Sequence, residues 1–410
     1  MESINHKVVI IGHGFTSRLA VIRSVAQIGC EVTVIVMAWY KRQGVLDTTK
    51  PIDCYSKYIN KIYYCYAKDY EGIIDILLTK CIDSNQKVVI IPGNDVSAAI
   101  IDANQERLNE FFLFPHIHHT PGFVEKWMDK VRQKELAQRQ GLEVPSSHIV
   151  KIKSHCYKLP ANITYPCFTK PLVTLVGGKK FFKKCDDESS LRDVLEIAGS
   201  NEDVKVLVED FKQIDTEYAL LGFSDGNDVI IPGILEILSL AHGGHFGVAC
   251  QGRVLPVTGF ENLISKFKLL VLEIGFVGVF DIDFYRSGND FYFGELNLRI
   301  GGSCYAVTKM GVNLPAMMVR YFYGEDISTM KKNVIGSATF VNERMCMDDW
   351  YDGFISTREY QSLLNNSDIS FVKDSEDSEP YKVYLREYRM KYMKRIVKHI
   401  IGRTKFDKSR

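Results

Sequence analysis

The chain begins with an alternation of apolar runs and helical patterns that predicts a parallel sheet. An apolar run from Lys7 to Gly12 leads through a glycine turn into a helical pattern over Ser17 to Ile28. A second apolar run, Glu31 to Met37, follows. Strands that read as continuous apolar runs are typical of sheets covered by helices on both faces. The order strand, glycine turn, helix, strand therefore predicts a Rossmann-like unit.

A further buried strand is predicted at Lys87 to Ile91, and the polar residues Asn94 and Asp95 follow it. Ligands of open α/β sheets lie beyond the carboxyl ends of the strands, so both side chains are candidate substrate contacts. Capping of the next helix by Asp95 is the equal alternative. A nicotinamide site at the first turn is disfavoured, because Ser17 stands at the third glycine position of the GxGxxG fingerprint.

Alternating apolar and polar positions over residues 280–298 predict two antiparallel strands joined by a turn at residues 287–290. Side chains on the two strands share a face only in one of the two registers. A three-residue loop between Ser287 and Phe291 would align two polar pairs across the strands, Asp283 with Glu295 and Asp281 with Asn297.

The polar side chains of this hairpin are oxygen ligands next to a cation. Asp283, Glu295 and Asn297 supply hard oxygens that suit a magnesium ion also held by phosphates. Arg299 could bind a phosphate or carboxylate through two parallel hydrogen bonds. The alternative is a surface hairpin whose acidic face is merely solvated.

Lysines and glycines upstream add a possible anion site. Lys170 lies in an apolar strand pattern, where a charge is costly to bury without an anion, so we expect it to face one. Gly177 and Gly178 follow closely and free the backbone to approach phosphate oxygens. Another apolar strand ends at Glu209, where unpaired backbone groups could hold a ligand. Three histidines, His116, His118 and His119, lack the spacing of a zinc motif.

Composition narrows the class of protein. The chain has 410 residues, enough for two or three domains, and its net charge of +1 gives no general case for nucleic acid. Its ten cysteines include no CxxC pair, which indicates reduced thiols and a cytoplasmic location. No apolar run reaches the roughly 18 residues of a membrane span, and the N-terminus reads as a strand rather than a signal segment.

The order of these motifs resembles the ATP-grasp superfamily over about residues 7 to 325. The resemblance implies an α/β fold, α+β in the ATP-binding part, with a Rossmann-like domain ahead of the ATP-grasp domain. The implied boundaries are residues 1–120, 121–330 with a lid at about 145–208, and a C-terminal extension over 331–410. It also implies these roles: Lys130 and Lys170 on the nucleotide phosphates, Gly177 and Gly178 in a loop over them, Glu209 to Phe211 at the adenine, Glu217 at the ribose, Asp283, Glu295 and Asn297 on magnesium, and Arg299 with Lys170 in catalysis.

The subgroup that the chain resembles is the carboxylate–amine ligases, such as D-aspartate ligase. The resemblance implies that ATP and Mg2+ activate a small carboxylate as an acyl phosphate, which an amine then converts to an amide. Other activities remain open: a carboxylase or carboxylate kinase of the same fold, a nucleotide-binding protein without catalysis, and a nicotinamide oxidoreductase. A homodimer is also left open.

The C-terminal segment has a different character from the rest of the chain. Residues 381–410 are rich in Lys and Arg, and a helical stripe runs through them at Tyr388, Tyr392, Ile396 and Ile400. A basic amphipathic helix is expected either to lie on the inner face of an anionic membrane or to dock on the protein with its basic side outward. The sequence favours neither.

Overall fold

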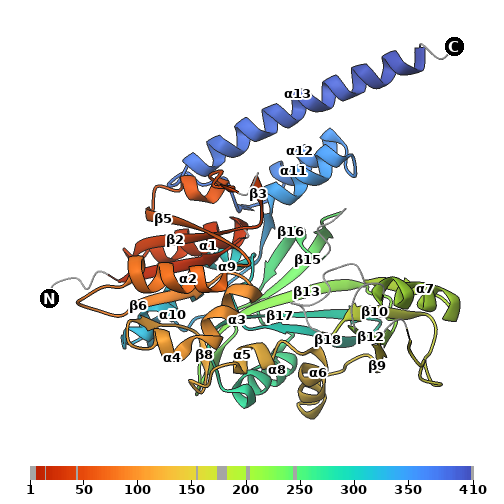
Figure 1. Cartoon of the computed structure of the whole chain (residues 1–410), viewed down its shortest axis with the longest axis horizontal. Coiled ribbons are helices and arrows are strands. Elements are labelled where there is room, and N and C mark those ends of the chain that lie inside the picture. Colours follow the sequence, from red (N-terminus) through yellow and green to blue (C-terminus); the bar gives the residue numbers. More distant parts are fainter. Residues whose placement is uncertain are drawn as a thin grey trace.

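The computed structural model describes residues 6–13, 15–42, 45–153, 156–172, 182–199, 204–242 and 247–407, except the side chains of 15, 41, 42 and 398–407 (Figure 1). Three sheets of five, four and nine strands organise this part of the chain, beside a small hairpin of β3 (Lys41–Arg42) and β4 (Val45–Leu46). This mixture of parallel and antiparallel sheets confirms the predicted fold class.

The N-terminal sheet is parallel throughout and has the strand order β5-β2-β1-β6-β7. Its central strands are buried on both faces, which explains their continuous apolar sequences. Helix α1 begins and ends two residues earlier than predicted, and Gly29 follows it with a positive φ of 75°. The elements are β1 (Lys7–Gly12), α1 (Phe15–Ala26), β2 (Glu31–Ala38), a 3-10 turn (Ile52–Tyr55), β5 (Ile59–Tyr66), α2 (Tyr70–Ile76), a π-helical turn (Leu77–Cys81), β6 (Val88–Pro92), α3 (Asp95–Ala103), α4 (Gln105–Leu108) and β7 (Phe112–Leu113).

The four-stranded sheet is antiparallel, has the order β11-β10-β12-β9, and packs against one helix through a small apolar core. In Figure 1 it lies on the opposite side of the molecule from the parallel sheet. We call it the lid sheet. Its elements are β9 (Ser147–Ile152), β10 (Cys167–Pro171), β11 (Lys183–Cys185), α7 (Glu188–Ala198) and β12 (Val204–Asp210).

The nine-stranded sheet forms the centre of the molecule, with β17 and β13 as its longest antiparallel pair. One core of the central sheet is rich in aromatic residues and includes side chains of α5, α6 and α8. A second core joins the central sheet to the parallel sheet and includes side chains of α1, α9 and α10. The elements are β8 (His116–Ile117), α5 (Phe123–Lys126), α6 (Lys130–Arg139), β13 (Thr216–Asp225), β14 (Val229–Ile230), β15 (Ile234–Leu240), β16 (Ala249–Leu255), α8 (Glu261–Ile274), β17 (Phe276–Ser287), β18 (Asp290–Asn297), α9 (Cys304–Lys309), α10 (Leu314–Phe322), a 3-10 turn (Ser328–Met330), β19 (Ala338–Val341) and β20 (Ile369–Ser370).

The C-terminal extension is built into this framework. Strand β19 pairs with β16, and helices α11 (Glu343–Asp352), α12 (Thr357–Asn365) and α13 (Glu379–Asp407) follow. The first half of α13 docks on the protein: the Tyr388 ring lies 5.0 Å from the Trp350 ring, and Tyr392 stacks on Trp350 at 6.0 Å. Ile396 is 42% exposed, and Ile400 lies outside the described side chains. The predicted stripe therefore packs at its start and is open to solvent further along.

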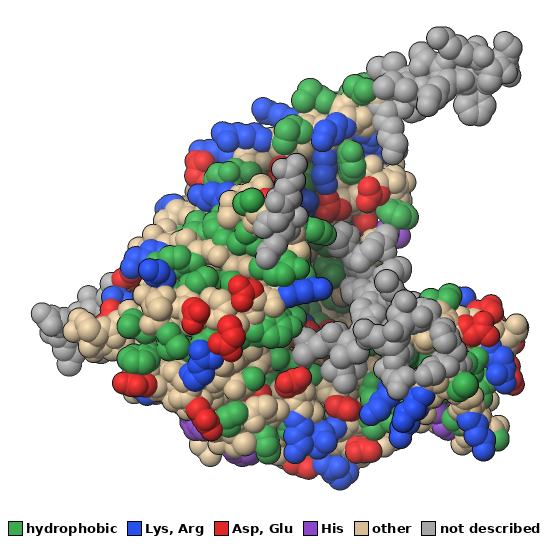
Figure 2. All heavy atoms as spheres, viewed as in Figure 1, with side chains coloured by type: hydrophobic (Ala, Val, Ile, Leu, Met, Phe, Trp, Pro, Cys, Tyr) green, Lys and Arg blue, Asp and Glu red, His purple; other side chains and the backbone are tan. Residues whose placement is uncertain are grey.

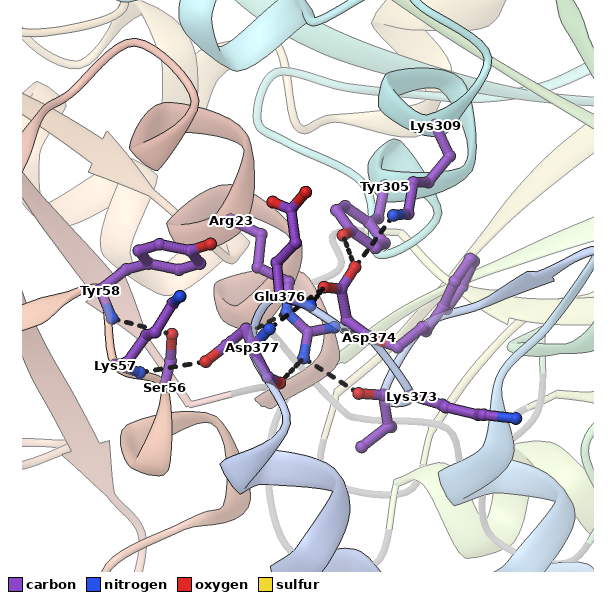
Figure 3. A network of polar contacts seen from close by, with 12 residues as sticks. Arg23, Ser56, Lys57, Tyr58, Tyr305, Lys309, Lys373, Asp374, Glu376 and Asp377 are labelled. Carbon is purple, nitrogen blue, oxygen red and sulfur yellow. Dashed lines mark hydrogen bonds and ion pairs between the residues drawn. The ribbon is translucent and has the colours of Figure 1, made fainter.

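A buried arginine fastens this extension to the N-terminal domain (Figure 3). The Arg23 side chain, on α1, lies 2.9 Å from the Asp377 carboxylate and donates to the carbonyl oxygens of Phe371 and Val372. The other Asp377 oxygen accepts from the Lys57 backbone N–H at 3.0 Å. Segments more than 300 residues apart in the sequence are thus joined by groups that water does not reach.

Candidate active site

The two strands β17 and β18 align the predicted polar pairs, although the turn between them differs from the prediction. Asp283 lies opposite Glu295 and Asp281 lies opposite Asn297, as predicted. The loop has two residues rather than three, because Ser287 pairs with Asp290. That loop alone would set Asp283 opposite Gly294. The register shifts by one residue between Asp283 and Phe284, and this bulge restores the expected alignment.

Gly294 makes the bulge possible. A Cβ atom at this position would lie 2.8 Å from the Asp283 carbonyl oxygen, which is closer than real Cβ contacts. Because the neighbouring atom is backbone, it cannot swing aside as a side chain would. The glycine is therefore the residue that allows Glu295 to face Asp283.

We expect Gly294→Ala to lower the stability of the protein by about 1–3 kcal/mol, because overpacking forces the two strands apart. The carboxylates would also separate, so any activity that depends on both should fall more than the stability does. Thermal unfolding measures the first effect. Gly302→Ala is the matched control, since a Cβ there meets nothing within 4 Å. Equal melting temperatures for both variants would contradict this role of the bulge.

The three predicted magnesium ligands lie on one face of the hairpin. The Asn297 amide nitrogen lies 3.4 Å from an Asp283 carboxylate oxygen, and Glu295 faces Asp283 across the strands. Asp283 is open to solvent, yet much protein surrounds it, and this partial desolvation together with Asp281 and Glu295 raises its pKa well above the usual range. Two carboxylates that repel each other, beside an amide oxygen, fit a hard divalent cation.

Acidic, histidine and cysteine side chains do not form a complete metal site by themselves in the part of the chain that the structure describes. Within the described ranges, no group of three or more His, Cys, Asp or Glu side chains is placed to hold a metal ion. The predicted ligand set has two carboxylates and one amide, so a magnesium ion there would need further oxygens from a ligand, as phosphates supply.

The predicted phosphate-binding lysines each lie against a carboxylate. Lys130 is the first residue of α6 and is almost fully buried, and its Nζ lies 2.6 Å from Glu295 Oε1. Lys170 lies on β10 with its Nζ 2.7 Å from Glu209 Oε2. The prediction that Lys170 faces an anion is confirmed, and the anion in this structure is a protein carboxylate.

A third lysine joins this group, and no pattern in the sequence indicated it. Lys134, one helical turn after Lys130, is buried and bonds through its Nζ to Glu209 Oε1. Burial alone would raise the pKa of Glu209, but Lys170 and Lys134 hold it below its usual value. Burial lowers the pKa of Lys134 to about 8, against the opposing effect of Glu209.

Arg299 lies between two acids from different sheets: Asp95 follows the parallel sheet, and Asp281 lies on the central one. Its Nε lies 3.1 Å from Asp95, at the start of α3, and its Nη1 lies 3.3 Å from Asp281. Burial alone would lower the pKa of Arg299, but the two carboxylates outweigh this effect and raise the pKa above its usual value. Asn94 rather than Asp95 caps α3, so the capping alternative is wrong for Asp95 and its carboxylate is free to meet Arg299.

The remaining predicted residues are placed as follows. Glu217 lies on β13 opposite Tyr285, close enough to Asp283 for the two charges to interact, and burial raises its pKa. The Phe211 N–H donates to the Pro166 carbonyl oxygen at 3.1 Å, so an adenine contact at Phe211 would have to use its ring or carbonyl oxygen. Gly177 and Gly178 lie outside the described residues.

The side chain of His242 contacts the C-terminal extension. The His242 ring lies 2.9 Å from Asp349, on the C-terminal helix α11. This contact places His242 at the junction with the C-terminal extension. His245 lies outside the described residues.

Known proteins resemble this chain in sequence over part of its length and in fold over most of it. No protein-family model matches. The carbamoyl phosphate synthase large chain of Pseudomonas syringae pv. tomato is 25% identical over 234 residues, which cover 56% of this chain and 22% of that protein. The match thus spans about a fifth of that much longer relative.

Two solved structures superpose on most of this chain. An N5-carboxyaminoimidazole ribonucleotide synthetase, crystallised as its ADP complex, superposes with a TM-score of 0.62 at 14% identity and covers 82% of this chain and 81% of that one. The L-amino acid ligase of Bacillus licheniformis gives a TM-score of 0.60 at 17% identity, with 82% and 79% covered. Together with the sequence match, these likenesses show that the chain has the fold of the ATP-grasp superfamily.

Proposed function

We propose that this protein is an ATP-dependent ligase that activates a carboxylate as an acyl phosphate and joins it to an amine. The observation that carries the proposal is the cluster at one hairpin, where Glu295 faces Asp283, Lys130 pairs with Glu295, and the charge of Arg299 acts on Asp283. Lys170 lies against Glu209, which also bonds to Lys134 on the helix of Lys130. Cations for phosphates and oxygens for magnesium are the two needs of phosphoryl transfer. The relatives are named as a synthase, a synthetase and a ligase, and one was crystallised with ADP.

In this proposal the chain's own residues bind, align and neutralise. Lys130 and Lys170 hold the nucleotide phosphates, and Arg299 stabilises the phosphoryl group during its transfer to the carboxylate. Asp283, Glu295 and Asn297 would hold magnesium, which supplies charge neutralisation on the phosphates when bound. No nucleophilic side chain takes part, because the substrate carboxylate attacks the γ-phosphorus itself and the amine then displaces phosphate.

The adenosine part of the nucleotide is assigned less directly. We propose that Glu217 bonds the ribose hydroxyls, since its half-buried carboxylate gains from hydrogen-bond donors. Phe211 and the backbone at Glu209 would flank the adenine. Gly177 and Gly178 would close over the phosphates. The domain boundaries at about residues 120 and 330, and a homodimer, remain predictions.

A screen for ADP release tests the function. Purified protein is incubated with MgATP and pairs of small acids and amines, and the products are weighed by mass spectrometry. ADP release that needs both an acid and an amine, with a product lighter than their sum by one water, supports the ligase. Release with bicarbonate instead indicates a carboxylase, and release with the acid alone indicates a carboxylate kinase. Nucleotide binding without ADP release in any mixture indicates a non-catalytic protein.

We also propose that the outer half of α13 contacts an anionic membrane surface. Figure 2 shows Lys and Arg side chains beside hydrophobic ones along this helix, where Met390, Met393 and Val397 are more than half exposed. The described helices include none that is both long enough and apolar enough to cross a bilayer. Each basic residue near an anionic surface would contribute on the order of 1 kcal/mol, and salt would screen it.

Vesicle co-sedimentation tests the membrane contact. We expect the full chain to sediment with anionic vesicles at low salt and to be released at moderate salt. A chain ending at residue 395, which keeps the contacts of Tyr388, Tyr392 and Arg395 with Trp350, should stay in solution. Equal and negligible sedimentation of both proteins would leave α13 as a docked helix only.

A further inference from the structure

Lys134 forms a contact between the lid sheet and the body of the molecule. It lies on α6, whose Gln133 side chain bonds both backbone groups of Leu296 on β18, at 2.7 and 2.9 Å. Its partner Glu209 lies on lid strand β12. The side chain of Lys134 is only 6% exposed and that of Glu209 only 3%. A charged pair that is so fully removed from water is costly unless each charge is compensated.

Glu209 has one more cation than its charge requires. Its two carboxylate oxygens are shared between Lys134 and Lys170, which lies on the neighbouring lid strand and is 18% exposed. If Lys170 leaves for a phosphate, Glu209 keeps Lys134. Without Lys134, movement of Lys170 away from Glu209 would leave the buried carboxylate without a counter-charge. Lys170 would therefore remain paired with Glu209.

The ion pair of Lys130 and Glu295 differs, because another cation could replace its lysine. Glu295 is 24% exposed and would gain a magnesium ion when Lys130 turns to the nucleotide. Glu209 is only 3% exposed, which leaves little room for such a replacement, and its ion pairs among the described residues are those with Lys134 and Lys170. The second lysine on α6 is therefore the one that allows the lid lysine to move.

We propose that Lys134 is a positioning residue, which keeps Glu209 neutralised so that Lys170 is released to the nucleotide. It acts through Glu209 and touches neither substrate nor metal. This inference rests on the proposed function, because it takes the phosphate-binding role of Lys170 from there. Lys134 is then the residue that sets how tightly the lid holds a nucleotide.

The first test is the affinity for MgADP, measured by calorimetry at neutral pH. We expect Lys134→Met to bind about tenfold more weakly than the wild type or worse, since one buried counter-charge is missing. Lys170→Met should lose at least as much. The control is Lys266→Met, which removes a lysine bonded to the Gly141 carbonyl just after α6 and should bind normally.

A second substitution separates positioning from a general loss of structure. The double variant Lys134→Met/Glu209→Gln lacks the carboxylate that pairs with Lys170. Its affinity for MgADP should therefore return to within a few-fold of the wild type. A merely structural role for Lys134 predicts that the double variant binds as poorly as the single one, and that result would overturn the proposal. An unchanged affinity in Lys134→Met would overturn it too.

The pH profile gives an independent readout. Lys134 faces Glu209 on β12, Lys170 on β10 and Lys130 on its own helix, and its pKa is lowered to about 8. Between pH 7 and 9 it loses its proton, so wild-type affinity for MgADP should fall as pH rises. The Lys134→Met profile should be flat over that range. A wild type that binds no MgADP at any pH would refute the proposed function itself, whereas an identical fall in both proteins would refute only the role of Lys134.

Discussion

Replacing Glu295 with alanine is expected to abolish ADP formation, with a loss of about a thousandfold or more. Glu295 is one of only two carboxylates in the proposed magnesium site, and metal neutralisation of a transferring phosphoryl group is worth several kcal/mol. The same change removes the partner of the buried Lys130, so we also expect the stability to fall by about 2 kcal/mol. The assays are ADP release with saturating MgATP and thermal unfolding.

The two effects of this substitution can be measured apart. In Glu295→Ala/Lys130→Met the unpaired lysine is gone, so the melting temperature should recover while ADP release stays absent. Glu273→Ala is the control, because that glutamate forms an exposed pair with Arg139. Turnover near the wild-type rate in Glu295→Ala would show that Glu295 is not part of the magnesium site, whatever the effect of the substitution on stability.

Replacing Arg23 with alanine is expected to lower the free energy of unfolding by about 3–5 kcal/mol, the usual cost of breaking a buried ion pair from one side. The Arg23 side chain is 2% exposed and the Asp377 side chain is fully buried, so the carboxylate would be left with the Lys57 N–H. The carbonyl oxygens of Phe371 and Val372 would also lose their donor. Urea unfolding and the rate of proteolysis of α13 measure the effect.

A surface pair provides the comparison for Arg23. Arg107→Ala breaks an exposed pair with Glu71 and should change stability by less than about 1 kcal/mol. Faster proteolytic release of the C-terminal helices in Arg23→Ala, but not in Arg107→Ala, would show that this arginine fastens the extension. Equal unfolding curves for the two variants would mean that contacts other than Arg23, such as the pairing of β19 with β16, hold the extension in place.

Several features followed from the sequence because they depend on neighbouring residues only. Apolar runs such as Lys7–Gly12 identify buried parallel strands, since both faces of such strands meet apolar helices. A lysine inside an apolar strand implies an anion, and Lys170 does lie against one. The spacing of Asp283, Glu295 and Asn297 along two adjacent strands indicated that they would share a face.

Other features were decided by contacts between distant segments. The expected alignment of Asp283 with Glu295 is present, but a shorter loop and a bulge at Gly294 produce it together. Local sequence could not show this, because a bulge is fixed by how two strands fit across the sheet. Arg299 meets Asp95 only because the parallel sheet packs on the central one.

The burial of Lys134 and its pairing with Glu209 could not be predicted from the sequence. By its spacing it is an ordinary lysine of a polar helix, and such residues are normally solvated. It is buried because the lid strand β12 lies over this turn of α6, so that a helix lysine meets Glu209 some 75 positions later. The C-terminal extension is a second example, because its helical stripe suited a membrane or a protein surface equally. Only the position of Trp350 decided that Tyr388 and Tyr392 pack on the protein. A sequence fixes which side chains need a partner, whereas the tertiary structure chooses the partner, because burial and distance depend on the whole chain.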